Sequence, residues 1–153
     1  MKYYLAYGSN LNFQEMNKRC PDCKLVGKKN LYGKELAFKG SKVGYLTLED
    51  ASILKKTPVG IFEISDKDED SLDFYEGYPD LYSKEYISFL FKGKIIKGLY
   101  YVINSNFSYQ EPTSEYFYDC LKGYIDFGFN QESLYDALEK CSRLKEKSKV
   151  KKL

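Results

Sequence analysis

Apolar and polar residues alternate in short runs over the first hundred positions of the chain, and this alternation predicts β-strands. Gly33, Gly40 and Pro58 interrupt the runs and predict turns between them. Residues 91–94, Phe-Lys-Gly-Lys, join two long runs and are typical of a hairpin. The predicted strands are residues 2–7, 24–32, 35–38, 43–48, 59–64, 82–91 and 94–103.

Four later or intervening segments carry apolar residues at helical spacing, and they predict helices. Asn12, three residues before Glu15, resembles a capping box, and Ser65 has the same spacing to Asp68. The predicted helices are residues 12–19, residues 65 to 77 or 79, residues 113–128, and a last segment from about 131. Because most of the strands precede most of the helices, we expect an α+β domain rather than an alternating parallel sheet.

The size and composition are those of one soluble globular domain. The chain has 153 residues, of which 43% are apolar and 30% charged, and no apolar stretch approaches the ~18 residues of a membrane span. We therefore expect a domain over residues 1–145 that binds no membrane, acts as a monomer or homodimer, and is cytoplasmic because no secretion signal is visible.

The end of the chain is basic. Residues 140–153 hold seven basic side chains against one acidic side chain, and we expect residues 146–153 to form a basic tail. The tail has no aromatic residues between its lysines on which bases could stack, so we expect a solvated, frayed helix end and no binding of nucleic acid.

The chain contains no histidine. Serine or cysteine nucleophiles paired with imidazole, and metal sites built on histidine, are therefore excluded. Any proton transfer falls to a carboxylate, tyrosine, lysine or cysteine side chain. We expect no metal and no other cofactor.

The first candidate for chemistry is the segment Tyr7-Gly8-Ser9-Asn10-Leu11, directly after the first predicted strand. A glycine followed by two small polar residues leaves successive amide N–H groups unobstructed, and such a concavity suits oxygen anions. The alternative is a simple turn in which Ser9 or Asn10 caps the next helix.

The second candidate is Glu76, which falls at the C-terminus of a predicted helix, before Gly77. The helix dipole disfavours a carboxylate there, and aromatic neighbours that remove water raise its pKa further. A carboxyl group that titrates near neutrality can act as a general acid and base. The alternative is a solvated helix end, and Asp73 is either a partner of Glu76 or a surface acid.

Cys20 and Cys23 have the spacing of a redox dithiol or of half a zinc site. A thioredoxin-like pair lies at the start of a helix, whereas this pair follows a predicted helix that Pro21 ends. Cys120 and Cys141 lie on separate predicted helices and do not complete a zinc site. We interpret all four as reduced thiols and keep a redox protein as a third hypothesis.

These motifs together resemble those of the gamma-glutamylcyclotransferase-like family, also called AIG2-like or butirosin BtrG-like. The matching segments are Tyr-Gly-Ser-Asn-Leu at 7–11, Leu-Asp-x-x-Glu-Gly at 72–77, Tyr82, and segments at 19–21, 58–62 and 112–116. They occur in the family's order over residues 3 to about 140. The resemblance implies a small mixed β-barrel flanked by helices, with the loop and Glu76 facing one cavity.

The activity that the resemblance implies is cyclisation of a γ-glutamyl amide to 5-oxoproline, with release of an amine. Glu76 would be the acid and base, the segment from Gly8 to Leu11 would bind the γ-glutamyl unit, and Tyr7, Tyr82 and Tyr116 would form walls. The released group stays open among glutathione-type, γ-glutamyl amino acid, γ-glutamyl-lysine and antibiotic-intermediate substrates. The alternative function is a non-catalytic module that binds a small carboxylate.

Overall fold

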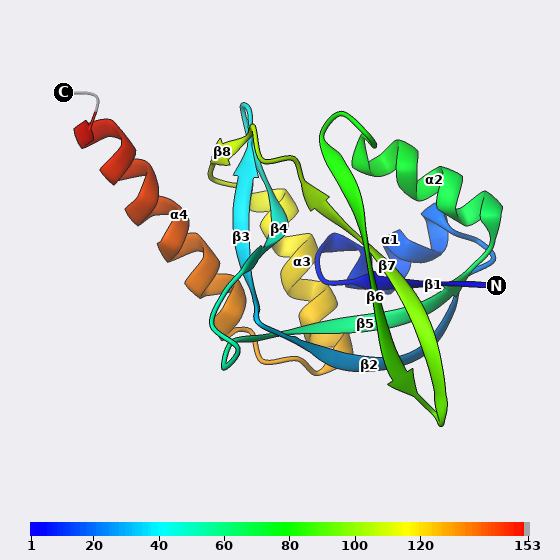
Figure 1. Cartoon of the computed structure of the whole chain (residues 1–153). Coiled ribbons are helices and arrows are strands. Elements are labelled where there is room, and N and C mark those ends of the chain that lie inside the picture. Colours follow the sequence, from blue (N-terminus) through cyan, green and yellow to red (C-terminus); the bar gives the residue numbers. More distant parts are fainter. Residues whose placement is uncertain (152–153) are drawn as a thin grey trace.

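A computed structural model describes the backbone of residues 1–151 and the side chains of residues 1–147. Its larger sheet has five strands, in which β1 and β7 are parallel and every other pair is antiparallel. The strands follow the order β2 (Lys24–Tyr32), β5 (Lys56–Ile64), β1 (Lys2–Ala6), β7 (Lys94–Ile103) and β6 (Tyr82–Phe91). β1 is thus central, and it delivers the chain from the middle of the sheet into the Tyr7–Leu11 segment (Figure 1).

A second, three-stranded sheet stands beside the first (Figure 1). It consists of β4 (Gly44–Asp50), β3 (Lys34–Gly40) and β8 (Ser108–Tyr109). The α+β class is confirmed, but the expected barrel does not close, because no ladder joins the two sheets within the described residues. The Ile103 N–H donates instead to the Thr47 hydroxyl across the junction of β7 and β4, at 2.9 Å.

The helices begin where the capping residues predict. They are η1 (Ser9–Leu11, a 3₁₀ turn), α1 (Phe13–Arg19), α2 (Asp66–Glu76), α3 (Ser114–Phe127) and α4 (Glu132–Lys151). Ser65 and Asp68 form the complete, reciprocal capping box at the start of α2. The box expected at Asn12 is only half formed: Asn12 accepts from the Glu15 amide, but the Glu15 carboxylate lies 3.4 Å from Arg19 instead.

The predicted boundary at residue 145 does not coincide with a change of structure. Helix α4 packs along β3 and continues as one helix through Lys151, so residues 146–151 of the expected tail extend α4 (Figure 1). Residues 152 and 153 lie outside the described residues. None of the described helices is both long enough and apolar enough to cross a membrane.

Close packing against α3 holds the segment after β1 in place. A Cβ atom at Gly123 would lie 2.6 Å from the Leu11 Cβ, so only glycine lets α3 approach this closely. The Tyr124 hydroxyl donates to the Tyr7 carbonyl at 3.1 Å. Leu11 and Tyr124 are both fully buried. The core therefore fixes the backbone from Tyr7 to Leu11 before any ligand binds.

Candidate active site

The two sequence motifs meet at one cavity of about 240 Å³. The segment after β1, the C-terminal end of α2, and residues of β4, β6, β7 and α3 form its walls. The lining residues are Tyr4, Tyr7, Gly8, Ser9, Asn10, Tyr45, Leu46, Phe74, Tyr75, Glu76, Gly77, Leu81, Tyr82, Tyr101 and Tyr116. All but one of the predicted site residues are among them, although Glu76 and Ser9 are separated by 67 positions in the chain.

The exception is Leu11. Its side chain is fully buried in the core and does not line the cavity. Its amide N–H donates to the Gly8 carbonyl at 3.0 Å and closes the 3₁₀ turn. Leu11 therefore anchors the segment, and its amide N–H, which was predicted to bind substrate, is already paired within the turn.

The amides before Leu11 are differently placed. In the part of the chain that the structure describes, the N–H groups of Gly8, Ser9 and Asn10 donate to no protein acceptor. All three residues line the cavity, and the Ser9 and Asn10 side chains are buried. Three unpaired donors on one side of a small cavity form a site suited to a carboxylate or carbonyl oxygen.

Glu76 is the last residue of α2, and Gly77 ends the helix in the left-handed conformation with φ 63°. The Glu76 side chain is half-buried in the cavity wall, and its Oε1 atom accepts from the Asn10 side-chain amide at 3.4 Å. Burial of the carboxyl group raises the pKa of Glu76 from 4.5 to about 8, although the nearby Arg19 opposes the shift. Glu76 can therefore exchange a proton near neutral pH.

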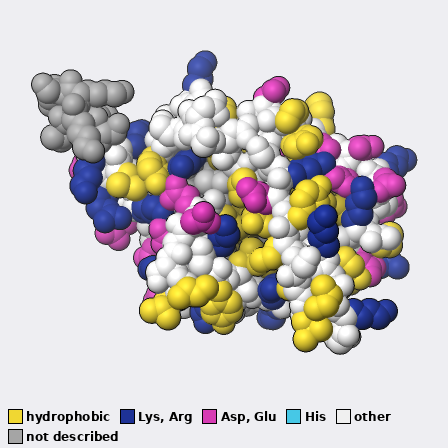
Figure 2. Space-filling view, viewed as in Figure 1, with side chains coloured by type: hydrophobic (Ala, Val, Ile, Leu, Met, Phe, Trp, Pro, Cys, Tyr) yellow, Lys and Arg dark blue, Asp and Glu magenta, His cyan; other side chains and the backbone are white. Residues whose placement is uncertain are grey.

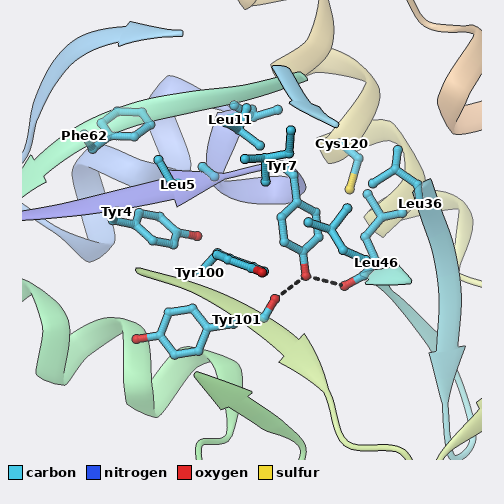
Figure 3. Close-up of a cluster of buried hydrophobic side chains, with 14 of the residues drawn as sticks. Tyr4, Leu5, Tyr7, Leu11, Leu36, Leu46, Phe62, Tyr100, Tyr101 and Cys120 are labelled. Atoms are coloured by element: carbon cyan, nitrogen blue, oxygen red, sulfur yellow. Dashed lines mark hydrogen bonds between the residues drawn. The ribbon is translucent and has the colours of Figure 1, made fainter. Parts of the chain in front are cut away.

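Seven tyrosines line the cavity, and two pairs of them differ in the hydrogen bonds that they can still make. The Tyr7 hydroxyl donates to the Tyr101 carbonyl, and the Tyr82 hydroxyl donates to the Leu46 carbonyl at 2.6 Å. Figure 3 shows the Tyr7 hydroxyl between the carbonyl oxygens of Leu46 and Tyr101. Tyr7 and Tyr82 thus have only lone pairs left for a ligand.

The hydroxyls of Tyr4 and Tyr116 accept hydrogen bonds from the protein instead of donating them. The Tyr4 hydroxyl accepts from the Asn10 side-chain amide at 2.9 Å, and the Tyr116 hydroxyl accepts from the Leu46 amide at 3.0 Å. Each therefore retains a proton to donate. Burial raises the pKa of both hydroxyls well above the ordinary value, so they are neutral donors at physiological pH.

Arg19 is a functional candidate that the predictions did not include. It is 16% exposed, donates to the Asn10 Oδ1 atom, and lies with its guanidinium carbon 3.5 Å from the centre of the Tyr75 ring. A basic residue in the last turn of a helix is ordinarily explained by the helix dipole, so its spacing gives no further signal. The Arg-x-Pro match at residues 19–21 was the only available indication.

Asp73 is not a partner of Glu76. Its carboxylate accepts from the Tyr101 hydroxyl at 2.6 Å and lies 2.9 Å from the Lys84 ammonium group. These contacts join α2 to the larger sheet at β6 and β7. Asp73 therefore fixes the position of the helix that carries Glu76.

The structure gives no support to a dithiol at Cys20 and Cys23. Cys20 is buried at the C-terminal end of α1, and burial raises the pKa of its thiol to about 12. Burial also raises the pKa of Cys23. A reactive cysteine needs a lowered pKa. Within the described residues, no group of Cys, Asp and Glu side chains is arranged to hold a metal ion.

The family model for gamma-glutamyl cyclotransferase, AIG2-like proteins matches residues 4–119, which contain both motifs. No curated protein matches the sequence at a significant level.

Solved structures share the fold. A structure described as gamma-glutamyl cyclotransferase is 20% identical, with a TM-score of 0.76 over 89% of this chain and 85% of that chain. The uncharacterised human protein LOC79017 is 22% identical, with the same TM-score and coverage. YkqA from Bacillus subtilis is 19% identical, with a TM-score of 0.70 over 92% of this chain and 54% of that chain.

Proposed function

Because the chain belongs to the gamma-glutamyl cyclotransferase, AIG2-like family, we propose that it converts a γ-glutamyl amide into 5-oxoproline and a free amine. The observation that carries the proposal is the convergence of Glu76 and the free amides of Gly8, Ser9 and Asn10 on one cavity. Family membership supports a cyclotransferase-like enzyme, and the specific reaction is our inference from the site.

The cavity suits the γ-glutamyl unit in size and in charge. Its volume of about 240 Å³ lies below the roughly 300–1,000 Å³ of sites for drug-sized ligands. None of the described lysines and arginines lines it, so the free amides would bind the substrate α-carboxylate. The ionised Glu76 and the lone pairs of Tyr7 and Tyr82 would bind the α-ammonium group.

The reaction needs no nucleophile from the protein. The substrate α-amine attacks its own γ-carbonyl carbon, so a C–N bond forms to close the five-membered ring and the C–N bond to the departing amine breaks. Holding the two reacting groups together can contribute roughly 7–11 kcal/mol, and this is the task of the enclosed cavity.

Glu76 would carry the proton between the two nitrogens. The ionised form accepts one proton from the bound α-ammonium group, which frees the nucleophilic amine, and passes that proton to the departing nitrogen. It then accepts the proton that the ring nitrogen loses after attack and passes it to the released amine, which leaves as an ammonium ion. A pKa of about 8 suits both steps near neutral pH. The protons left on Tyr4 and Tyr116 are the donors available to the oxyanion that forms on the γ-carbonyl oxygen.

The test is the substitution Glu76→Gln, assayed by release of 5-oxoproline and free amine from a panel of γ-glutamyl amides. Loss of a general acid and base should lower kcat by roughly 10²–10⁴-fold. Binding of 5-oxoproline should remain measurable by calorimetry, because the amides of the Gly8 segment are unchanged.

A matched control lies on the same helix. Asp70→Asn alters an exposed carboxylate that does not line the cavity and should leave kcat unchanged. Equal rates for Glu76→Gln and the wild-type protein would eliminate the role of Glu76. Ligand binding without turnover of any substrate in the panel would instead indicate the binding module.

A further inference from the structure

Arg19 contacts the site from outside the cavity. It does not line the cavity, but its guanidinium group donates to Asn10 Oδ1, and the Asn10 side-chain amide donates in turn to Glu76 Oε1 at 3.4 Å. A three-membered chain of contacts therefore runs from α1 through the Gly8 segment to the end of α2.

The chain determines which way the Asn10 side chain faces. Arginine has only donors, so the atom of Asn10 that faces Arg19 must be the carbonyl oxygen. The two amide hydrogens then face the Tyr4 hydroxyl, at 2.9 Å, and Glu76. Rotation of the amide by half a turn would place its oxygen against the Glu76 carboxylate, where two acceptors repel each other.

Arginine suits this place better than lysine. The guanidinium group makes three contacts at once: it donates to Asn10, pairs with Glu15 at 3.4 Å, and lies over the Tyr75 ring. The Tyr75 hydroxyl in turn is 2.9 Å from the Ser9 hydroxyl. Arg19 therefore supports the Gly8 segment at two successive residues, and a single ammonium group cannot reproduce this.

Arg19 is also the one charged group described near Glu76. The titratable groups whose pKa the charge of Glu76 raises are Tyr4, Tyr7, Tyr75, Tyr82, Tyr116 and Cys120. Burial raises the pKa of each of them, so they are neutral when Glu76 titrates. The positive charge of Arg19 opposes the effect of burial on the pKa of Glu76.

We propose that Arg19 is a positioning residue, which orients Asn10 so that its amide donates to Glu76 and directs one carboxylate oxygen away from the substrate. The second oxygen, Oε2, is then the proton acceptor. The inference rests on the proposed function for its effect on catalysis, but its effect on Glu76 is independent of any substrate.

The first experiment measures Glu76 without turnover. In protein labelled with ¹³C at the glutamate carboxyl carbon, Glu76→Gln assigns the Glu76 signal, and the signal is followed against pH. Arg19→Gln should move the midpoint to higher pH than in the wild-type protein. Arg19→Lys, which keeps the charge, should move it less. An unchanged midpoint in Arg19→Gln would overturn the proposal.

The second experiment measures kcat and KM against pH for the best substrate of the panel. Arg19→Gln and Arg19→Lys should both lower kcat by about 10–100-fold, the effect of a misplaced catalytic group, with a smaller change in KM. The low-pH limb of the kcat/KM profile, which reports the free enzyme, should move with the NMR midpoint. Retention of wild-type kcat in Arg19→Lys would show that charge alone is needed and would reject the orienting role.

Lys18→Gln is the matched control, because it removes an exposed positive charge from the same turn of α1, and Lys18 has no described ion pair and does not line the cavity. It should leave both the midpoint and kcat unchanged. If Arg19→Gln does not fold, the NMR midpoint of Glu76 and the kcat of Arg19→Lys test the proposal instead. Failure of the wild-type protein to cyclise any γ-glutamyl amide would refute the proposed function, while the NMR titration would still decide the role of Arg19.

Discussion

The two ends of helix α2 carry the same kind of side chain in opposite surroundings. The first turn holds Asp66, Asp68 and Glu69, where the helix dipole favours negative charge. Glu69 lies 2.5 Å from Lys2 and 2.6 Å from Lys84. Figure 2 shows acidic and basic side chains interspersed at this end of the molecule. These carboxylates are thus matched to their environment.

The last turn holds Glu76, where the dipole disfavours a negative charge. In the described part of the chain its contacts are one long hydrogen bond from Asn10 and the more distant charge of Arg19. The pKa values differ accordingly. Burial opposes ionisation of Glu69, but hydrogen bonds from Lys2 and Lys84 outweigh it and lower the pKa, whereas burial dominates at Glu76 and raises the pKa.

The comparison separates stability from chemistry within one helix. Acids at the first turn hold the helix on the sheet, and the acid at the last turn is kept in a state that is unfavourable for the fold. A single residue in an unfavourable environment, within an element whose other residues are in favourable ones, is often a functional residue. Glu76 is such a residue in α2. The two ends should therefore respond in opposite ways to pH.

The largest expected effect is the pH dependence of stability due to Glu76. Its folded pKa of about 8 exceeds the unfolded value of 4.5, so the folded state holds the proton more tightly and the free energy of unfolding falls as pH rises from about 4.5 to about 8. At about 1.4 kcal/mol for each pKa unit, the fall is roughly 5 kcal/mol.

Urea unfolding of the wild-type protein and Glu76→Gln at pH 5, 7 and 8.5 measures this fall. Glutamine cannot titrate, so the variant should be the more stable protein at pH 8.5, and the difference should narrow toward pH 5. Glu69 acts in the reverse sense, because its lowered pKa gives stability that is lost as pH falls below 4.5. If the free energy of unfolding changed with pH in the same way in both proteins, Glu76 would be ionised and solvated in the folded state.

The next effect concerns the first turn. Lys84 is 13% exposed and lies 2.6 Å from Glu69 and 2.9 Å from Asp73. Lys84→Met removes the cation from two partly buried carboxylates and should lower the free energy of unfolding by about 3 kcal/mol at pH 7. The loss should shrink as pH falls below 4.5, because the stability that the lowered pKa of Glu69 provides is lost there.

Denaturant unfolding measures this change, with Lys94→Met on the neighbouring strand as the control. Lys94 is exposed and has no described ion pair, so its replacement should change stability by less than about 0.5 kcal/mol. If the two substitutions lowered the free energy of unfolding equally, apolar contacts rather than ion pairs would hold α2 on the sheet.

Sequence patterns predicted the capping box at the start of α2 correctly. They predicted the raised pKa of Glu76 at its end only as one of two alternatives. Capping at Ser65 depends on residues three positions apart, so local spacing contains the information. The raised pKa of Glu76 depends on its burial in a cavity that Tyr4, Tyr116 and other residues distant in the chain also line, and no local pattern records that burial. The helix dipole and the aromatic neighbours therefore gave only one of two interpretations of Glu76, and the resemblance to a known motif favoured it over a solvated helix end.

The same distinction explains the other misses. Leu11 was assigned to the site with its motif, because a motif does not show which of its members the core takes. Tyr4, Tyr75 and Tyr101 line the cavity but follow strand or helix periodicity like ordinary core residues. Strand β8 has only two residues and is too short to show alternation. Whether a sheet closes into a barrel depends on pairing between strands that are distant in the chain. The prediction of a barrel came from the resemblance and not from the sequence pattern.

The smallest effect comes from the cap itself. The Ser65 hydroxyl accepts from the Asp68 amide at 3.0 Å and donates to the Asp22 carboxylate at 2.9 Å. Ser65→Ala should therefore lower the free energy of unfolding by about 1 kcal/mol. Because the cap lies at the far end of α2 from Glu76, the ¹³C midpoint of Glu76 should not move.

Ser71→Ala is the control. It removes a hydroxyl whose described hydrogen bond is to the Lys67 carbonyl within the helix, and it should change stability less. A shift of the Glu76 midpoint in Ser65→Ala would show that the two ends are coupled through the helix, and the separation of stability from chemistry would then fail.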